Sequence, residues 1–341
     1  MDRDRRLSEI GAFREVKMLI LNEQDLRELV SWPQMIDFVE EAYRIFARGE
    51  SLTPDRLTVT RGRDTITFMP CFTNEIFGTK FLTLFLDNPE KGYPYLDGLM
   101  FLNDLDNGKT LSIMDARYLT ALRTGAVGGV GVRHLSRPDC KTAGVIGAGQ
   151  QGFTQAIYAA NARNLERLYL YDAFDKDWPE FIARLHKEID QPDLDILVCK
   201  SGEELVKKSE IVITATPAEV PVLPDDPELL RGKCIIAIGS YKHEMREIPD
   251  SIWQLLDEVY IELPFALEET GDLYYPLQEG LFTEDQIRYI GDLLEAGTEV
   301  YPQPGETSFF KSVGMGILDL HVARKLYELA VEHGIGQKVK F

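Results

Sequence analysis

A glycine-rich segment in the middle of the chain constrains the fold more than any other feature of the sequence. It follows the apolar run Ala143–Ile146 and precedes a helical pattern that begins at Gln150. In a GxGxxG spacing the first glycine allows a tight turn, the second lets the backbone approach a pyrophosphate, and the third lets helix and strand pack closely. Amide groups at the start of the helix then face the phosphates. The segment therefore predicts a dinucleotide-binding turn made of Gly147, Ala148, Gly149, Gln150, Gln151 and Gly152.

The same glycines could also form an ordinary turn, and the next apolar run helps to decide between the two interpretations. Leu168–Tyr171 is followed by Asp172, twenty residues after Gly152. A carboxylate at this position accepts hydrogen bonds from both ribose hydroxyls of NAD, and it repels the additional phosphate of NADP. The alternative is that Asp172 caps a helix. We predict NAD as the cofactor, with NADP disfavoured.

Short apolar segments alternate with helical patterns from residue 143 to residue 262, which is typical of a parallel sheet covered on both faces. Two of these segments stop in small or hydroxyl residues where the fourth and fifth strands should end. Ligands of open α/β sheets bind beyond the carboxyl ends of the strands, so these residues are expected at the nicotinamide unless they are plain turn residues. They are Thr214, Ala215, Thr216, Gly239 and Ser240. The expected strands are 143–146, 167–171, 195–198, 211–214, 234–238 and 258–262.

The first third of the chain has a different pattern. Asn22 can cap a short helix, with Asp25 at the capping-box position, and Pro33 fits the first turn of a second helix. Strand-like segments rich in Thr, Phe, Leu and Ile follow. We expect a mainly antiparallel sheet packed against the two opening helices, with residues 1–17 as a loosely attached charged extension. The expected strands are 56–61, 65–70, 78–86 and 98–105; later helical patterns cover 115–134 and 312–333.

The charge of the chain excludes several kinds of partner. With 37 Lys and Arg against 56 Asp and Glu, the formal net charge is −19. Such an acidic surface repels phosphate backbones and anionic lipid, so neither nucleic acid nor membrane is expected as a partner. The charged start of the chain lacks the apolar region of a secretory signal. We therefore expect a cytoplasmic protein.

The cysteines and histidines do not suggest a metal site. The four cysteines are far apart, form no CxxC pair and lie mostly in apolar runs, and the five histidines form no HExxH pattern. Buried, reduced thiols are expected in place of disulfides or metal ligands. The cysteines are Cys71, Cys140, Cys199 and Cys234.

Three basic residues lie in otherwise apolar or small-residue surroundings: Arg56, Lys80 and Arg123. A charge in such a segment is expensive to bury unless another group pairs with it. The guanidinium fork suits a substrate carboxylate, and a desolvated lysine can exchange protons near neutral pH. The alternative for each residue is a salt bridge or a side chain that extends to the surface.

Five landmarks occur in a fixed order along the chain, and together they resemble the ornithine cyclodeaminase/mu-crystallin family from Met18 to the end. They are Gly78–Phe81, Asp104–Gly108, Ala121–Ala126, Gly147–Gly152 and Phe310–Gly314.

The resemblance implies a Rossmann-type doubly wound parallel sheet inserted into a second α/β domain with a mainly antiparallel sheet. Residues 1–128 and 312–341 then form the substrate-binding and dimerisation domain, and residues 129–311 form the NAD-binding domain. Family members are dimers joined through their N-terminal sheets, so we expect a homodimer.

The resemblance also assigns roles to individual residues. Arg56, Lys80 and Arg123 match positions that hold the substrate carboxylate, and Lys80 is also suited to proton transfer. Asp172 matches the ribose-binding acid of the NAD-using members. Thr214, Ser312 and Val313 match positions close to the cofactor, where we assign Ser312 to the cofactor and Val313 to the substrate.

One position differs from the family pattern in a way that bears on the reaction. Cyclodeaminases that resemble this chain have an aspartate two residues after the glycine equivalent to Gly239, where this chain has Tyr241. A phenol is a poor base beside a carboxylate but a usable acid or hydrogen-bond donor. The substitution weighs against cyclodeamination and leaves the cofactor assignment intact.

These observations favour an NAD-linked oxidoreductase that acts at the α-carbon of a small amino or imino acid, such as a ketimine reductase or an amino-acid dehydrogenase. In this interpretation Arg56 and Arg123 bind the carboxylate, Lys80 exchanges a proton with the substrate, and Tyr241 assists. Ornithine cyclodeaminase, which recycles NAD+, is the first alternative. A crystallin-like binding protein is the second.

Overall fold

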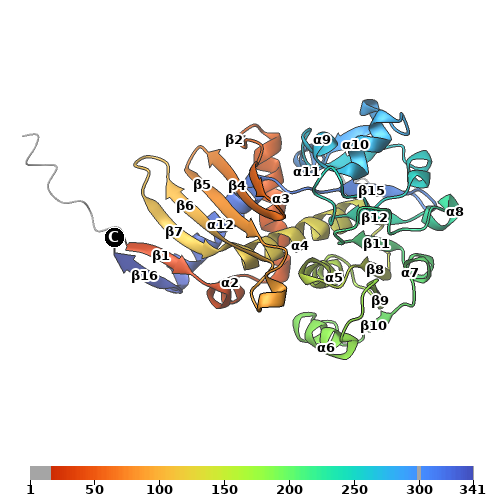
Figure 1. Ribbon diagram of the computed structural model, residues 1–341, viewed down its shortest axis with the longest axis horizontal. Helices are drawn as coiled ribbons and strands as arrows, with labels where there is room; N and C mark the ends of the chain where they lie inside the picture. Colours follow the sequence, from red (N-terminus) through yellow and green to blue (C-terminus); the bar gives the residue numbers. More distant parts are fainter. Residues whose placement is uncertain (1–16, 298–300, 341) are drawn as a thin grey trace, which may run out of the picture. The chain divides into compact units, whose positions relative to one another are not determined.

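The computed structural model describes residues 17–297 and 301–340 (Figure 1). Contacts within the chain divide it into two compact units. Among the described residues, the first unit holds 17–30, 51–119 and 319–340, and the second holds 31–50, 120–297 and 301–318. The predicted charged extension, apart from Lys17, lies outside the described residues. The predicted domain limits at 128/129 and 311/312 stay a prediction.

The first unit is built on a mixed sheet that is mainly antiparallel, as predicted. Its strands follow the order β16-β1-β7-β6-β5-β4-β2, and β3 also pairs with β4. Only the β1–β7 pair among the described strands of this sheet is parallel. Strands β1, β2, β7 and β16 have no counterpart among the expected strands. The bounds are β1 (Lys17–Leu21), β2 (Ser51–Leu52), β3 (Leu57–Arg61), β4 (Asp64–Thr73), β5 (Ile76–Leu84), β6 (Leu96–Asp104), β7 (Thr110–Asp115) and β16 (Gln337–Lys340).

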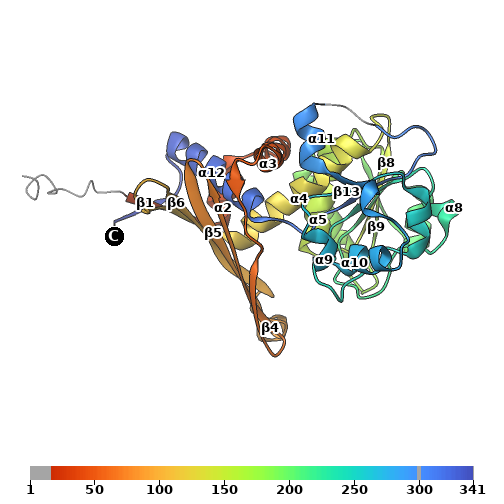
Figure 2. The same cartoon turned by 90° about the horizontal axis from the view of Figure 1, so that it is seen from above.

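One face of this sheet belongs to the core of the first unit. Strand β5 alternates strictly between buried and half-buried residues, as a strand with one covered face does. The helix α12 (Gly316–His333) runs beside β5 and β6 (Figures 1 and 2). A Cβ on Gly78 would lie only 3.0 Å from Leu320 Cδ1, so the missing side chain of Gly78 permits the close approach of helix and strand.

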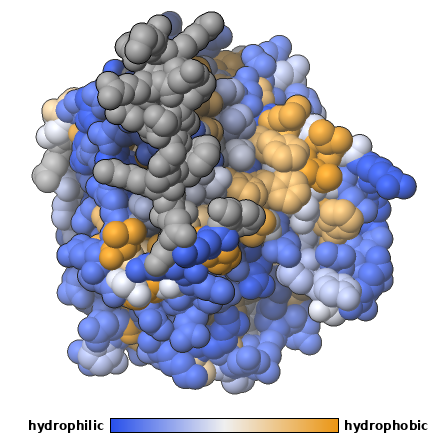
Figure 3. All heavy atoms as spheres, turned by 90° about the vertical axis from the view of Figure 1, so that its left-hand side faces the viewer, coloured by the Kyte–Doolittle hydropathy of each residue, from blue (hydrophilic) through white to orange (hydrophobic). Residues whose placement is uncertain are grey.

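The opposite face of the sheet carries apolar side chains that remain partly exposed. The rings of Phe68 and Phe81 pair across β4 and β5 with a centroid separation of 5.1 Å, and those of Phe72 and Phe77 do the same. Leu99 on β6 lies opposite Phe81 and is 41% exposed. Figure 3, which looks at the molecule from the left of Figure 1, shows apolar side chains gathered at its upper right.

The two opening helices form as predicted, and they fall in different units. At α2 (Glu23–Leu29), the Asn22 side chain accepts from Asp25 N at 3.0 Å, and Asp25 accepts from Asn22 N at 2.9 Å. Pro33 lies in the first turn of α3 (Trp32–Ala47). Helix α3 contacts α5 and α11 and is grouped with the second unit, so the packing of both opening helices on the antiparallel sheet stays a prediction.

The second unit contains the predicted parallel sheet, and every pair of neighbouring strands in it is parallel. The order of the strands is β10-β9-β8-β11-β12-β15-β13-β14. Strands β9 and β10 therefore lie on one side of β8, and β11, the next strand along the chain, lies on its other side. Strands β11 and β12 are buried at every residue, which requires cover on both faces. The bounds are β8 (Thr142–Ile146), β9 (Arg167–Tyr171), β10 (Asp195–Val198), β11 (Ile211–Thr214), β12 (Cys234–Ala237), β13 (Val259–Ile261), β14 (Ile287–Tyr289) and β15 (Ser308–Lys311).

Two expectations at the end of the chain are corrected. The last helix is expected to begin at Ser312, but it begins at Gly316. The residues before Ser312, Ser308–Lys311, form the unpredicted strand β15. Strand β15 pairs with β12 on one side and β13 on the other, so Ser312 follows a strand and does not start a helix. The helix ends at His333, and Gly334 adopts a φ of +70° as expected of a helix-ending glycine.

Helices connect the strands of the second unit. Helix α5 contacts α3 and α6, and α7 contacts α8. None of the helices within the described ranges is both long and apolar enough to span a membrane. The bounds are α4 (Ala116–Leu135), α5 (Gln150–Ala162), α6 (Trp178–Glu188), α7 (Gly202–Lys208), α8 (Pro227–Leu230), α9 (Ala266–Glu269), α10 (Gly271–Gln278) and α11 (Ile290–Ala296).

Candidate active site

The glycine turn lies between β8 and α5, where the sequence predicts it, and each of its glycines occupies a different environment. Gly147 has a φ of +102°, which only glycine adopts without strain, and its N–H donates to Tyr171 O at 2.9 Å. A Cβ on Gly152 would lie 1.7 Å from Gly147 O, so this glycine is required by packing. A Cβ on Gly149 would meet no described atom within 4 Å, so Gly149 leaves open space beside the backbone.

Asp172 lies beside this turn. Its Oδ2 accepts from Ala148 N at 2.7 Å, its Oδ1 accepts from Phe174 N at 2.9 Å, and Lys176 Nζ is 3.6 Å from Oδ2. The carboxylate thus joins the end of β9 to the turn after β8. An acceptor group is therefore held next to the open space at Gly149, which is the arrangement that a dinucleotide requires.

The ends of β11 and β12 lie next to the same turn. A Cβ on Gly147 would be 2.5 Å from Ala215 O, which follows β11. Thr214 is paired with Ala237 in the sheet, and Ser312 N donates to Ala237 O at 3.1 Å. The structure therefore brings together the predicted cofactor residues of this unit at one edge of the sheet: Gly147, Ala148, Gly149, Gln150, Gln151, Gly152, Asp172, Thr214, Ala215, Thr216, Gly239, Ser240 and Ser312.

Tyr241 begins a loop that leaves this edge and returns to it. The residue is half-buried, and Lys242 Nζ lies 5.8 Å from its ring centroid. The Ser240 hydroxyl donates to Met245 O at 2.9 Å, which closes the loop at its base.

Arg123 and Val313 belong to a buried group around Glu262. Oε2 of Glu262 accepts from Val313 N at 2.9 Å and Gly314 N at 2.6 Å, and Oε1 accepts from the hydroxyl of Tyr43. A Cβ on Gly314 would lie 2.8 Å from a guanidinium nitrogen of Arg123. Burial, with the negative charge of Glu262, holds the pKa of Tyr43 well above its ordinary value, so the hydroxyl keeps its proton and donates.

Lys80 and Arg56 lie in the first unit. Lys80 Nζ donates to Asp319 Oδ1 at 2.8 Å, and both side chains have no exposed surface. Lys80 is opposite Met69 on β4 and Met100 on β6, so its neighbours along the sheet are apolar. Arg56 is half-buried in the segment before β3, which begins at Leu57, one residue later than expected.

Sequence reasoning missed three buried acids: Asp319, which pairs with Lys80, Glu262, which accepts from Val313 N, and Glu247. Asp319 lies in the apolar run Ile317–Ala323, and Glu262 follows the buried strand β13. The criterion that identified Lys80, a charge within an apolar segment, would have identified both. Glu247 lies in a polar stretch, where no such signal exists.

The cysteines are buried, as expected. Burial raises the pKa of Cys71 to about 11 and that of Cys234 to about 12. Within residues 17–297 and 301–340, no three His, Cys, Asp or Glu side chains gather in a way that could hold a metal ion.

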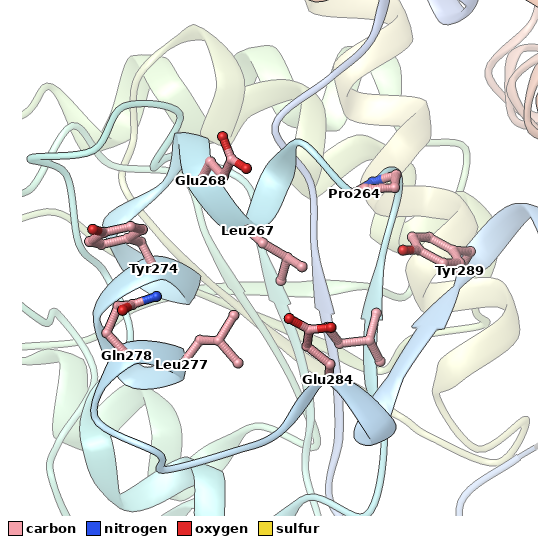
Figure 4. Close-up of a pocket in the computed structure, with 9 residues that line it drawn as sticks. Pro264, Leu267, Glu268, Tyr274, Leu277, Gln278, Glu284 and Tyr289 are labelled. Carbon is pink, nitrogen blue, oxygen red and sulfur yellow. The ribbon is translucent and has the colours of Figure 1, made fainter.

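The second unit also has a surface hollow of about 430 Å³ (Figure 4). Its lining comes from α9, α10, β14 and the segments just before α9 and β14, and it contains none of the predicted site residues. The lining residues are Pro264, Leu267, Glu268, Tyr274, Leu277, Gln278, Glu284, Ile287 and Tyr289.

The parallel sheet and the glycine turn after its first strand define a Rossmann-type dinucleotide-binding protein. The chain belongs to the ornithine cyclodeaminase/mu-crystallin family, whose model matches residues 16–334. It is 32% identical over 332 residues to the Delta(1)-pyrroline-2-carboxylate reductase of Bacillus cereus, a match that covers 95% of this chain and 100% of the relative.

Two solved structures have the same fold over almost their full length. The Thermococcus litoralis Delta(1)-pyrroline-2-carboxylate reductase, in complex with NADH and L-proline, matches with a TM-score of 0.87 and 31% identity, over 94% of this chain and 100% of that chain. An archaeal alanine dehydrogenase dimer with bound NAD matches with a TM-score of 0.86 and 27% identity, over 95% of this chain and 99% of that chain.

The glycine environments lead to a paired prediction. Gly152→Ala should lower the free energy of unfolding by about 1–3 kcal/mol, because its methyl group would overlap Gly147 O. Gly149→Ala should leave stability within about 0.5 kcal/mol of wild type, because the added methyl enters open space. Chemical denaturation of both variants measures the difference. Equal stabilities for the two variants would contradict the packing role of Gly152.

Proposed function

We propose that the chain is an NAD(H)-dependent oxidoreductase that acts on the C=N or C–N bond at the α-carbon of a small imino or amino acid. The observation that carries the proposal is the enclosed Lys80 ammonium group, which is paired with Asp319 in the core face of the first sheet. Such a buried charge is expensive, and proton transfer is a use that justifies it. The relatives named above, two pyrroline-2-carboxylate reductases and an alanine dehydrogenase, support the same class of substrate.

The residues at the carboxyl edge of the parallel sheet fit NAD as the cofactor. Gly149 leaves room for a group close to the backbone, and Asp172 offers carboxylate oxygens beside that room. When bound, the cofactor supplies or accepts a hydride at its nicotinamide ring. A carboxylate at Asp172 favours the free ribose hydroxyls of NAD over the phosphate of NADP.

The protein's own part in the reaction is to hold the substrate and to move a proton. We assign Arg56 and Arg123 to the substrate carboxylate and Val313 to the substrate side chain. Reduction of an imine adds a hydride to the α-carbon and a proton to the nitrogen, which gives the amine. Lys80 donates that proton and Tyr241 assists. In the oxidative direction Lys80 takes the proton back.

The proposal is tested by NADH consumption with cyclic imines such as 1-pyrroline-2-carboxylate, and with pairs of a 2-oxo acid and an amine. We expect stoichiometric loss of NADH absorbance with at least one imine, and much slower loss with NADPH. An ornithine-to-proline assay with catalytic NAD+ runs beside it, because cyclodeamination consumes no net cofactor. If NADH is never consumed and ornithine yields proline, the family's other reaction is correct and this proposal fails.

The role of Lys80 is tested by two substitutions. Lys80→Ala should lower turnover by about 10²–10⁴-fold while NADH binding persists. Because loss of one partner from a buried ion pair destabilises by about 3–5 kcal/mol, Lys80→Arg serves as a second variant that keeps the charge beside Asp319. The variant should fold because the charge is kept. Its turnover should remain low because arginine does not give up its proton. A loss of less than about threefold in either folded variant would remove Lys80 from the chemistry.

We further propose that the protein is a homodimer joined through the apolar outer face of the first sheet. The rings of Phe68, Phe72, Phe77 and Phe81 lie on this face, and burying them against a second copy would remove apolar surface from water. The archaeal alanine dehydrogenase, which matches over almost its whole length, is a dimer.

Sedimentation equilibrium tests the dimer. The wild-type mass should be twice that of one chain, and Phe68→Asp should reduce it to that of one chain, because a carboxylate cannot be buried unpaired in an apolar interface. Val331→Asp is the matched control, since Val331 is an exposed apolar residue (58%) on α12. A Phe68→Asp protein that stays dimeric would place the interface elsewhere.

A further inference from the structure

Glu247 is completely enclosed at the carboxyl edge of the parallel sheet, and it accepts four hydrogen bonds there. Oε1 accepts from the backbone N–H of Thr216 at 2.7 Å and from its hydroxyl at 2.8 Å. Oε2 accepts from Gly239 N at 2.7 Å and Ser240 N at 3.1 Å. The two oxygens therefore serve two neighbouring strands: Oε1 holds the end of β11, and Oε2 holds the end of β12.

A second buried acid holds the backbone of Glu247. Oδ1 of Asp272, in the first turn of α10, accepts from Glu247 N at 2.7 Å and Ile248 N at 2.9 Å. Its Oδ2 lies 3.2 Å from Lys311 Nζ, and neither side chain of this ion pair has exposed surface. Lys311 is the last residue of β15. Three adjacent strands, β11, β12 and β15, are thus connected at their carboxyl ends by two acids and a lysine.

This network is expensive to bury, so stability alone does not account for it. Burial raises the pKa of Glu247 above its ordinary value, and the positive charge of Lys311 opposes that rise. Apolar residues of similar volume often stabilise a core as well as buried ions or better. What the network supplies is a fixed backbone position. The space is already tight, because a Cβ on Gly239 would lie 2.2 Å from Thr216 N and 2.7 Å from Glu247 Oε1.

The same carboxylate fixes both ends of the loop that carries Tyr241. The loop leaves the sheet after Gly239 and returns at Glu247, whose own side chain binds the amides of Gly239 and Ser240. The base of the loop is held by the hydrogen bond from Ser240 Oγ to Met245 O at 2.9 Å. Its outer part rests on α10, where Gly271 N donates to Lys242 O at 3.3 Å.

We propose that Glu247 is a positioning residue for the nicotinamide half of the cofactor site and for Tyr241. Its carboxylate sets the relative positions of Thr216 and Gly239–Ser240, which the sequence predicts at the nicotinamide, and the inference therefore rests on the proposed NAD-dependent function. The adenine half depends on the turn after β8 and on Asp172, which do not contact Glu247 through any of these bonds. The turn after β8 does border the Glu247-held segment, since a Cβ on Gly147 would lie 3.0 Å from Thr216 Cγ2. The nicotinamide half, which Glu247 holds by direct hydrogen bonds, should therefore depend on Glu247 more strongly than the adenine half.

Glu247→Gln tests this with almost no change in shape. An amide has one accepting oxygen and one donating NH₂ group, so one of the two pairs of donors must then face another donor. We expect NADH to bind about tenfold or more weakly, with a reduced change in its fluorescence, while ADP, which lacks the nicotinamide half, binds with wild-type affinity. Both affinities are measured by titration well below the unfolding temperature.

Glu210→Gln is the matched control at the opposite edge of the same sheet. Oε2 of Glu210 accepts from Lys141 N at 2.7 Å and Thr142 N at 3.0 Å, at the start of β8, and its Oε1 lies 3.2 Å from Arg137. This substitution disturbs the same kind of carboxylate–amide hydrogen bonds, but it does so at the amino end of β8, away from the carboxyl edge of the sheet. It should lower the unfolding temperature and leave the affinities for both NADH and ADP unchanged.

The outcomes distinguish the inference from the function on which it rests. If wild-type protein binds neither NADH nor NAD+, the proposed function fails. If wild type binds NADH, and Glu247→Gln either binds it within threefold of wild type or loses NADH and ADP equally, the positioning role is overturned. Should Glu247→Gln not fold, Glu247→Asp keeps the charge but is too short to reach both strands. Glu247→Asp should therefore also lose affinity for NADH but not for ADP. If it does not, the positioning role of Glu247 is overturned.

Discussion

Each of the two units encloses an ion pair whose members lie far apart in the sequence, and the arrangement of functional groups depends on these pairs. In the first unit Lys80 meets Asp319, 239 positions later, with both side chains fully buried. In the second, Lys311 meets Asp272, also without exposed surface. An isolated charge in such surroundings would cost several kcal/mol or lose its ionisation. The elements that carry the paired residues must therefore pack in one relative position, since any other position would leave a buried charge without its partner.

The second unit uses carboxylates as connectors between backbone segments, and this explains how its sheet edge acquires a defined shape. Asp172 joins β9 to the turn after β8, Glu247 joins β11 to β12, and Glu262 joins the end of β13 to the segment after β15. In each case one side chain accepts backbone N–H groups that the sheet itself leaves unpaired where its strands end. Amides that carry charge-assisted hydrogen bonds have little freedom to move. A surface built in this way is ready for a ligand before the ligand arrives.

The sequence predicts the parts of this arrangement that are local in the chain. The β8–α5–β9 unit follows from glycine spacing and from Asp172, because a turn of this kind needs particular residues at particular positions. The buried Lys80 follows from a charge in an apolar strand. Its partner does not, because nothing in a single sequence joins residues 80 and 319. For the same reason β15 is absent from the expected strands: its four residues, Ser308–Lys311, gain strand character only from β12 and β13 on either side. The position of α3 in the second unit likewise depends on its contacts with α5 and α11, which local pattern does not reveal.

The place of β15 between β12 and β13 has a consequence for how the chain is made. A ribosome synthesises β12 and β13 before β15, so these two strands emerge with a gap between them that only residues 308–311 fill. The nascent second unit can assemble β10, β9, β8, β11 and β12 early, and β13 can pair with β14, but these two parts of the sheet are not joined until β15 has been made. Until then their unpaired edges and apolar side chains are available for wrong pairings. Chain elongation, rather than diffusion within a finished chain, thus sets the earliest moment at which this sheet can close.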